Sequence, residues 1–143
     1  MERTIFEEEH KMLSVALSAN SAEQEVAPHH EKWEKEGIVL RELWEKLDNM
    51  AFGGWMCSEE CGGGGIKDFR YNAIVGEELI RVGASVEVGF GLHSDIVIPY
   101  ILAYGGDEQK QRWLPKMVSG EMITAIAMSA NPAHGSDLQG GHV

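Results

Sequence analysis

Three adjacent polar residues, His93, Ser94 and Asp95, have the side-chain types of a hydrolase triad and lie within a long apolar stretch. In a Ser-His-Asp triad the hydroxyl, the imidazole and the carboxylate must reach one another. Consecutive side chains on a helix do not face one another, so this run does not predict a hydrolase. Polar groups on a buried helix usually satisfy one another, and a local hydrogen-bonded cluster is the structural interpretation.

Two other groups of residues have chemically suggestive spacing. Cys57 and Cys61 could begin a zinc site, but zinc usually takes four thiolate or imidazole ligands, and no second Cys pair or close His pair completes the set. The sequence therefore predicts no metal site. Residues 62–65 are four glycines that could cradle a phosphate, but Ile66 and Lys67 follow where a P-loop needs Lys and Ser or Thr. A flexible connection between helices is the preferred interpretation.

Composition narrows the class of protein. The 143 residues are 43% hydrophobic and 24% charged, which fits one domain-sized core in a soluble acidic protein. The net charge is -11, with 12 Lys and Arg against 23 Asp and Glu, so no basic patch for nucleic acid is expected. No apolar run approaches the roughly 20 residues of a membrane span, and the N-terminus lacks a signal-peptide core. The predicted compartment is the cytoplasm.

Most of the chain reads as helix. Thr4 and Glu7 are spaced as a capping box, which predicts a helix start at Thr4, and Pro28 limits its length. Asp68 is the predicted N-cap of a helix that ends near Gly83. Further apolar stripes predict the buried faces of these helices and of one between them: Phe6, Leu13, Ala16 and Leu17; Leu40, Leu43, Trp44, Leu47 and Met50; Tyr71, Ile74, Val75, Leu79 and Val82.

The second half of the chain predicts a change from helices to a strand. Residues 85–104 are the longest apolar stretch and predict a central, mostly buried helix, with Pro99 inside it. Asp107 is the predicted cap of a short helix through Val118. Residues 122–128 then form a short, β-branched apolar run, which predicts a strand.

Four segments in order carry a resemblance to a known family. They are E-V-A-P-H-H-E-K-W over residues 25–33, L-H-S-D-I-V-I-P-Y over 92–100, G-G-D-E-Q-K-Q-R-W-L-P over 105–115 and A-M-S-A-N-P-A-H-G-S-D over 127–137. Together they resemble the acyl-CoA dehydrogenase family, in which a G-x-x-E-Q-K-x-x-W-L-P stretch precedes an A-M-T-E-P-G-A-G-S-D signature. The chain looks most similar to the long-chain acyl-CoA dehydrogenases.

The resemblance implies a mainly α fold. Residues 1–120 would be the N-terminal all-α helical bundle of that family. Residues 121–143 would be the first strand and loop of its middle β domain, in a truncated chain without the rest of that domain or the C-terminal helical domain. The family places bulky aromatic residues where this chain has Ser21 and Ala22, so weaker packing is expected there.

The resemblance also implies the site residues. The run from Ala127 to Ser136 would contact flavin, with Ala127, Met128, Ser129, Asn131 and Ser136 as its cofactor-binding residues, and Ser136 would also contact the acyl-CoA substrate. Ser129 stands for the Thr of the signature and Asn131 for its Glu, and the run is one residue longer than the signature. The family's catalytic Glu belongs to the C-terminal domain, so no catalytic residue is assigned in this chain.

Two functions follow from these observations. The first is the N-terminal portion of an FAD-dependent flavoprotein oxidoreductase of fatty acid metabolism, an acyl-CoA dehydrogenase that is inactive in isolation and holds no FAD alone. The alternative is a noncatalytic helical binding or assembly module built on that scaffold. A third possibility is a complete small enzyme of unrelated chemistry, but no group of residues in the sequence supports it.

The predicted strand also bears on association. An apolar strand without partners exposes backbone donors and acceptors, which is a template for pairing with another chain. The sequence therefore predicts a homo-oligomer in which residues 121–130 pair with or pack against another copy. The competing prediction is a monomer whose tail folds back over its own helices or stays disordered. Acyl-CoA is the implied ligand, and neither nucleic acid nor membrane is an expected partner.

Overall fold

The computed structural model describes residues 4–48 and 54–126, and their regular secondary structure is helical, with no strand among them. This confirms the predicted mainly α fold. In chain order the elements are α1 (Glu8–Leu17), η1 (Ser18–Val26, π-helical), α2 (His30–Glu36), α3 (Arg41–Asp48), η2 (Glu59–Cys61, 3-10), α4 (Phe69–Gly91), η3 (Leu92–Val97, π-helical), α5 (Ile98–Tyr104) and α6 (Asp107–Val118).

The first helix starts later than predicted. α1 begins at Glu8 and not at Thr4. The backbone N–H of Glu7 donates to Nδ1 of the fully buried His10, 3.2 Å away, so a side chain in the first turn reaches back to the N-cap backbone, as the Glu of a capping box does. The helix continues through η1 and ends just before Pro28, as predicted. Ala22, at one of the two positions where weak packing was expected, is buried.

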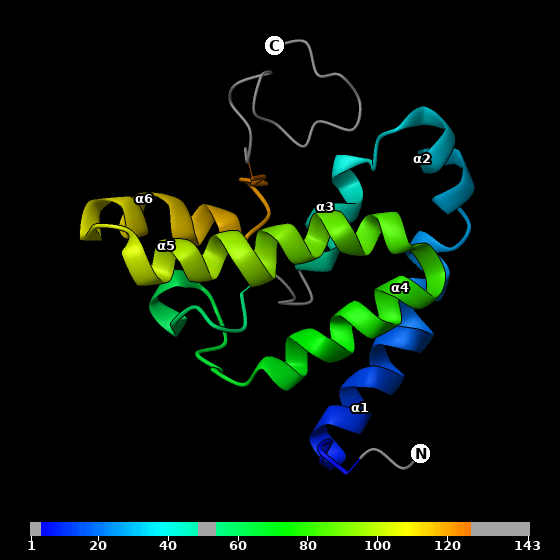
Figure 1. Ribbon diagram of the computed structural model, residues 1–143, viewed down its shortest axis with the longest axis horizontal. Coiled ribbons are helices and arrows are strands. Elements are labelled where there is room, and N and C mark those ends of the chain that lie inside the picture. The colour runs from blue at the N-terminus through cyan, green and yellow to red at the C-terminus, as the bar shows by residue number, and fades with distance from the viewer. Residues whose placement is uncertain (1–3, 49–53, 127–143) are drawn as a thin grey trace, which may run out of the picture.

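The longest helix turns a sharp corner at Gly83, as the predicted helix end near this residue anticipated. The part of α4 before this corner, residues 69–82, is named the first arm here. Asp68 caps it as predicted, because its Oδ1 accepts from the Arg70 backbone N–H at 2.9 Å. Gly83 leaves helical geometry, with φ -174° and ψ 91°, and the helix reverses there (Figure 1). A Cβ atom at Gly83 would lie 2.5 Å from Cδ2 of His30 and 2.9 Å from Cγ1 of Val26, so only glycine fits the corner.

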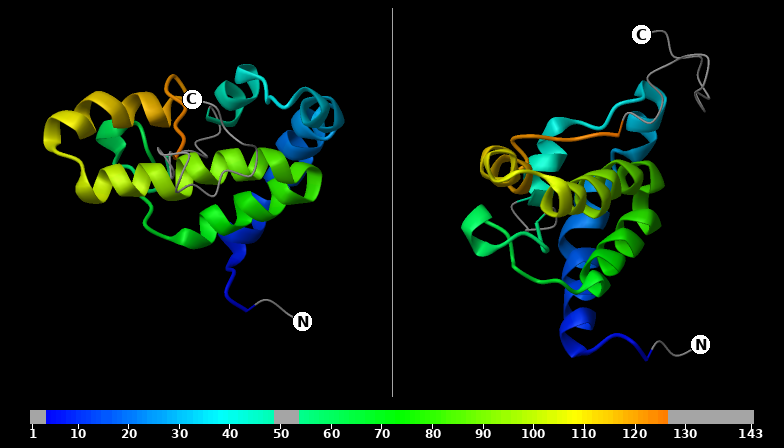
Figure 2. Two further views of the ribbon diagram at one scale, coloured as in Figure 1. Left: turned by 45° about the horizontal axis from the view of Figure 1, so that its top comes forward. Right: turned by 60° about the vertical axis from the view of Figure 1, so that its left-hand side comes forward.

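The arm after the corner, residues 84–104, is named the second arm here. It runs through the end of α4, η3 and α5, and the π-helical turn precedes Pro99, which occupies the start of α5. α6 then returns beside α5, and the two lie next to each other in all views (Figures 1 and 2). α6 is capped by Gly106 and not by the predicted Asp107, because Gln109 Oε1 accepts from the Gly106 N–H at 2.9 Å.

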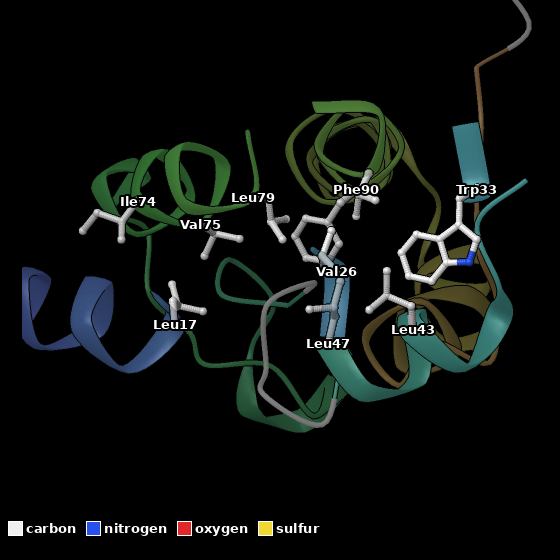
Figure 3. Packing of buried hydrophobic residues seen from close by; sticks show 10 residues of the cluster. Leu17, Val26, Trp33, Leu43, Leu47, Ile74, Val75, Leu79 and Phe90 are labelled. Atoms are coloured by element: carbon white, nitrogen blue, oxygen red, sulfur yellow. The ribbon is translucent and has the colours of Figure 1, made fainter. Parts of the chain in front are cut away.

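Buried apolar side chains form two clusters. The larger joins the first arm, the second arm and the N-terminal helices (Figure 3), and consists of Leu17, Val26, Trp33, Leu43, Leu47, Ile74, Val75, Leu79, Val86 and Phe90. The smaller lies under α6 and consists of Cys57, Ile98, Leu114, Met117 and Val118. The predicted stripes supply most of the larger cluster, but Leu40 is 46% exposed and Met50 lies outside the described residues.

One helix has the length and the apolar composition of a membrane span, a property that was not predicted from the sequence. Phe69–Tyr104 is long and apolar enough to cross a membrane by length and composition. The corner at Gly83 interrupts it, and its second arm buries His93 and Ser94 together with core residues such as Phe90. The core helix of a globular domain has these properties, so the helix positions the core here.

Candidate functional site

The predicted flavin-contact residues Ala127, Met128, Ser129, Asn131 and Ser136 lie outside the described residues. Their assignment stays a prediction, as does the domain boundary after residue 120. The structure describes the segment that leads to them, residues 121–126, which is named the exit segment here. No strand is assigned over 122–126, so the predicted strand is not confirmed in the part that can be inspected.

Arg41 and α6 hold the start of the exit segment. Nη2 of Arg41, at the start of α3, donates to the carbonyl oxygens of Gly120 and Glu121 at 3.3 and 2.5 Å. The Met122 backbone N–H donates to the carbonyl of Lys116 at 2.9 Å, and the Lys116 ammonium pairs with the Glu121 carboxylate at 3.1 Å. The backbone at the start of this segment is therefore bonded to its own chain, whereas the fold-back of the whole tail stays a prediction, because residues 127–143 lie outside the described residues.

His93 holds the middle of the exit segment from the second arm. Its ring is 1% exposed and packs edge-on against Trp44. Nε2 lies 3.0 Å from the carbonyl oxygen of Met117, and Nδ1 lies 2.8 Å from Oγ1 of Thr124 and 3.3 Å from its backbone nitrogen. Burial lowers the pKa of His93, although the bond to the Met117 carbonyl acts in the opposite direction.

The predicted His93, Ser94 and Asp95 cluster divides between two sides of the second arm. Ser94 Oγ donates to Asp95 Oδ1 at 2.7 Å, and Asn72 Nδ2 of the first arm donates to the same oxygen at 2.6 Å. His93 instead faces α6 and the exit segment. The three residues thus form no triad, and the predicted local cluster is confirmed only for Ser94 and Asp95.

A second carboxylate lies in the crevice between the two arms. A Cβ atom on Gly91 would lie 3.2 Å from Glu87 Oε1 and 4.0 Å from Asp95 Oδ2, so both carboxylates flank this glycine. Burial, and secondly the charge of Asp95, raise the pKa of Glu87. Asn72 is 5% exposed, and its Oδ1 has no hydrogen-bond partner among the described residues.

One face of the second arm is apolar and uncovered. Val88, Ile96, Tyr100 and Tyr104 are 59%, 48%, 62% and 76% exposed. The prediction of a mostly buried helix is therefore wrong for this face, because the described residues cover only the opposite side. Tyr100 and Tyr104 contact each other, with ring centroids 4.9 Å apart. An uncovered apolar face of this kind is suited to line a cavity for an acyl chain.

The glycine loop is a structural connection. The amides of Gly63, Gly64 and Gly65 donate to carbonyl oxygens of Ser58, Gly54 and Cys57. Amides that are already bonded within the chain do not cradle a phosphate, so the loop connects helices as predicted, while its flexibility stays a prediction. Cys57 is buried and Cys61 half-buried, and both are free thiols.

The structure brings together one further group with metal-ligand chemistry. Ligand atoms of Glu7, Glu9 and His10 lie within 4.8 Å of one another in the described part of the chain. Nδ1 of His10 accepts from the Glu7 N–H, whereas Nε2 faces an Asp68 oxygen at 3.6 Å and makes no hydrogen bond among the described residues. The group therefore serves to cap α1 and to join it to the start of α4. A pocket of about 310 Å³ lies between these two helices, beside Phe6 and Ile74 and apart from the exit segment.

Comparison with known proteins identifies this arrangement of helices. Residues 7–121 match the family model described as acyl-CoA dehydrogenase, N-terminal domain. A pig protein named long-chain specific acyl-CoA dehydrogenase, mitochondrial, is 45% identical over 138 residues, which are 96% of this chain and 31% of the relative. The chain thus spans about a third of the length of the relatives it matches.

Solved structures give the same result. The acyl-CoA dehydrogenase of Geobacillus kaustophilus superposes with a TM-score of 0.86 at 47% identity, covering 95% of this chain and 35% of that one. An acyl-CoA dehydrogenase of Bacillus anthracis, solved in complex with FAD, superposes with a TM-score of 0.82 at 29% identity, over 96% and 23% of the two chains.

The bent α4, the second arm and α6 thus form the N-terminal helical domain of a flavoenzyme fold. The chain belongs to the acyl-CoA dehydrogenase family. The resemblance based on four sequence segments is confirmed. The sequence did not indicate the roles of Arg41 and Thr124, because both act through contacts with residues about 30 to 80 positions away, which no local pattern records.

Proposed function

We propose that this chain supplies the N-terminal helical domain for FAD-dependent α,β-dehydrogenation of fatty acyl-CoA thioesters. The observation that carries the proposal is the coincidence of three features at one place. The family match ends at residue 121, the exit segment is bonded to the second arm there, and the predicted flavin-contact run follows. FAD bound to the related Bacillus anthracis protein supports the choice of cofactor.

In this proposal each part has a separate task. The reaction needs a carboxylate to remove the α-proton while flavin N5 accepts the β-hydride, so the two groups must face each other across the thioester. Ala127, Met128, Ser129 and Asn131 would contact the flavin, and Ser136 would contact both the flavin and the acyl-CoA. The exposed apolar face of the second arm would border the acyl chain. No residue of this chain is assigned as the base.

Long fatty acyl groups are the proposed substrate class. The pig relative, 45% identical, is named for long-chain substrates, and similarly named rat and mouse proteins are 44% and 43% identical. A large exposed apolar face with two tyrosines suits a long alkyl chain. The cytoplasmic compartment stays a prediction from the sequence, whereas these relatives carry the word mitochondrial in their names.

Flavin content tests the cofactor arrangement. We expect the 143-residue chain to purify colourless, because one loop cannot offset the entropy of fixing a large cofactor. The chain covers about a third of its relatives' length, and in this proposal most contacts enclosing FAD lie outside it. An absorbance spectrum of protein purified without added FAD is the measurement. A stoichiometric flavin spectrum would show that residues 1–143 enclose the cofactor.

Turnover tests the assignment of the base. We expect no acyl-CoA dehydrogenase activity with an artificial electron acceptor, even with FAD supplied, across acyl lengths. A heat-killed sample is the control. Activity above that control would place a catalytic carboxylate within these residues.

The noncatalytic binding or assembly module remains the second candidate. The uncovered apolar face of the second arm favours it, because such a face fits a protein partner as well as an acyl chain. Titration with a long-chain acyl-CoA separates the two functions. Chemical-shift changes at Tyr100 and Tyr104 support the acyl-binding role, and their absence at millimolar ligand supports the assembly role.

A further inference from the structure

The hydrogen bonds of His93 fix which ring nitrogen carries the proton. A carbonyl oxygen only accepts, so the bond to Met117 requires a hydrogen on Nε2. A backbone N–H only donates, so the contact from Thr124 requires a bare Nδ1, which can also accept from the Thr124 hydroxyl. The neutral Nε2–H tautomer satisfies both bonds, whereas the imidazolium would place two N–H groups against each other.

The ring thereby joins three parts of the chain at a buried point. η3 provides the histidine, the end of α6 provides the Met117 carbonyl, and the exit segment provides Thr124. Arg41 also holds this segment, but its side chain is 54% exposed. A buried bond between fixed partners restricts geometry more than one made by a long exposed side chain.

Burial alone does not explain a histidine at this position. The site is almost fully enclosed by Trp44, Met117 and Thr124, and an apolar ring would fill it without the cost of burying an imidazole. What an apolar ring cannot do is bond the Met117 carbonyl and the Thr124 N–H. The two hydrogen bonds of His93 therefore fix the direction in which the chain leaves α6.

We propose that His93 is a positioning residue of the flavin site, which fixes the exit segment so that the flavin-contact run begins at a defined place. This inference rests on the proposed function. Thr124 precedes Ala127 by only three residues, so a hydrogen bond at position 124 restricts where the backbone of the run can start. The residue that makes this bond lies on the second arm, whose other face is the proposed acyl-chain border.

Amide hydrogen exchange on the complete 143-residue chain is the first test. In His93→Phe we expect the amides of residues 122–126 to exchange about tenfold faster, which corresponds to the loss of one net hydrogen bond. Core amides of the first arm, such as Leu79, should be unchanged. Ser94→Ala is the matched control, because it removes a buried hydrogen bond one residue away, on the side facing Asp95, and should leave residues 122–126 protected.

Equal exchange of residues 122–126 in wild type and His93→Phe would overturn the proposal. So would an equal increase at all core amides, which would show a general loss of stability. Should His93→Phe fail to fold, the wild-type chain decides by a ring-nitrogen NMR titration. We expect the Nε2–H tautomer, with protection of the Thr124 amide lost together with ring protonation. The opposite tautomer, or protection independent of ring protonation, contradicts the proposal.

Excess FAD added to the ¹⁵N-labelled chain separates this inference from the proposed function. We expect shifts of residues 127–136 in the wild type, through binding too weak to survive purification, and a loss of most of these shifts in His93→Phe. The absence of shifts in the wild type would count against the flavin role of the run and hence against the positioning role. Equal shifts in both proteins would leave the proposed function intact and eliminate His93 as a positioning residue.

Discussion

Two acidic residues lie close together in the crevice between the two arms. Glu87 and Asp95 flank Gly91, and Asn72 bridges to Asp95 from the first arm. Burial and the neighbouring charge disfavour the ionised form of Glu87, so its pKa is higher in the folded chain than in the unfolded chain. The favourable contribution of this group is complete below its unfolded pKa and is lost as pH rises through the folded pKa.

Glu87→Gln is therefore expected to stabilise the chain at pH 7. The gain should be small, on the order of 0.5 kcal/mol, because the side chain is partly solvated. It should shrink as pH falls and vanish near pH 3, well below the ordinary glutamate pKa of about 4.3, where the side chain is protonated in both states. Urea midpoints at the two pH values measure the difference. Glu60→Gln, the same change at an exposed site, controls for net charge, and an equal gain in both variants would contradict the prediction.

At the scale of elements, the corner in α4 depends on the absence of one atom. A Cβ on Gly83 would overlap the His30 ring and Val26. Gly83→Ala is expected to lower the free energy of unfolding by about 1–3 kcal/mol, because the corner must open or α2 must move. Gly89→Ala on the same helix is the matched control. Its added methyl would meet Trp44 at an ordinary 3.5 Å, and alanine favours a helix, so little loss or a small gain is expected.

Denaturant unfolding of both glycine variants is the measurement for this corner. A Gly83→Ala chain as stable as the wild type would show that the helix reverses without the close approach of α2. The same experiment on Gly89→Ala shows whether any loss comes from the helix as a whole.

Sequence patterns predicted those elements whose determinants are local. Asp68 as a cap, the break near Gly83 and the buried positions of Leu43 and Leu47 follow from side chains within a few turns. The predicted start of α1 was wrong because His10, and not Glu7, reaches back to the N-cap backbone, which puts the cap at Glu7 instead of Thr4. The exposed face of the second arm was also missed, since a helix's hydrophobicity does not reveal which side the chain itself covers.

Sequence patterns predicted only part of the candidate site. The run from Ala127 to Ser136 was identified from its resemblance to a family signature. The anchors of the exit segment were not, because Arg41 and His93 are ordinary helix residues until the fold brings Glu121 and Thr124 to them. Contacts across 31 and 80 residues depend on tertiary packing, which a single sequence does not encode in its periodicity.

At the scale of the whole molecule, the sequence and the structure point to different surfaces for self-association of the chain. The sequence predicts pairing of residues 121–130 with another copy, but the exit segment already uses the N–H groups of Met122 and Thr124 within its own chain. The uncovered face of the second arm still favours self-association, so we expect a dimer or higher oligomer. Light scattering on the intact chain and on a version ending at Gly120 measures both contributions.

Light scattering on the two chain lengths separates the contribution of the tail from that of the helical faces. A monomeric intact chain at high protein concentration would contradict the prediction of a homo-oligomer. Association that is unchanged after removal of residues 121–143 would exclude the tail and assign the contact to the helical faces.

The two thiols beside the glycine loop are expected to react with a thiol reagent at different rates. Burial raises the pKa of Cys57 to about 11, so the thiolate that attacks a disulfide reagent is scarce even when the side chain becomes reachable. Cys61 lies four residues later, at the end of η2, and is half-buried. A thiol reagent should modify Cys61 at once and Cys57 only when residues 54–66 open. The slow labelling rate of the native protein would then report how often this region, packed under α6, comes apart. Equal rates at both cysteines would mean that it is open most of the time.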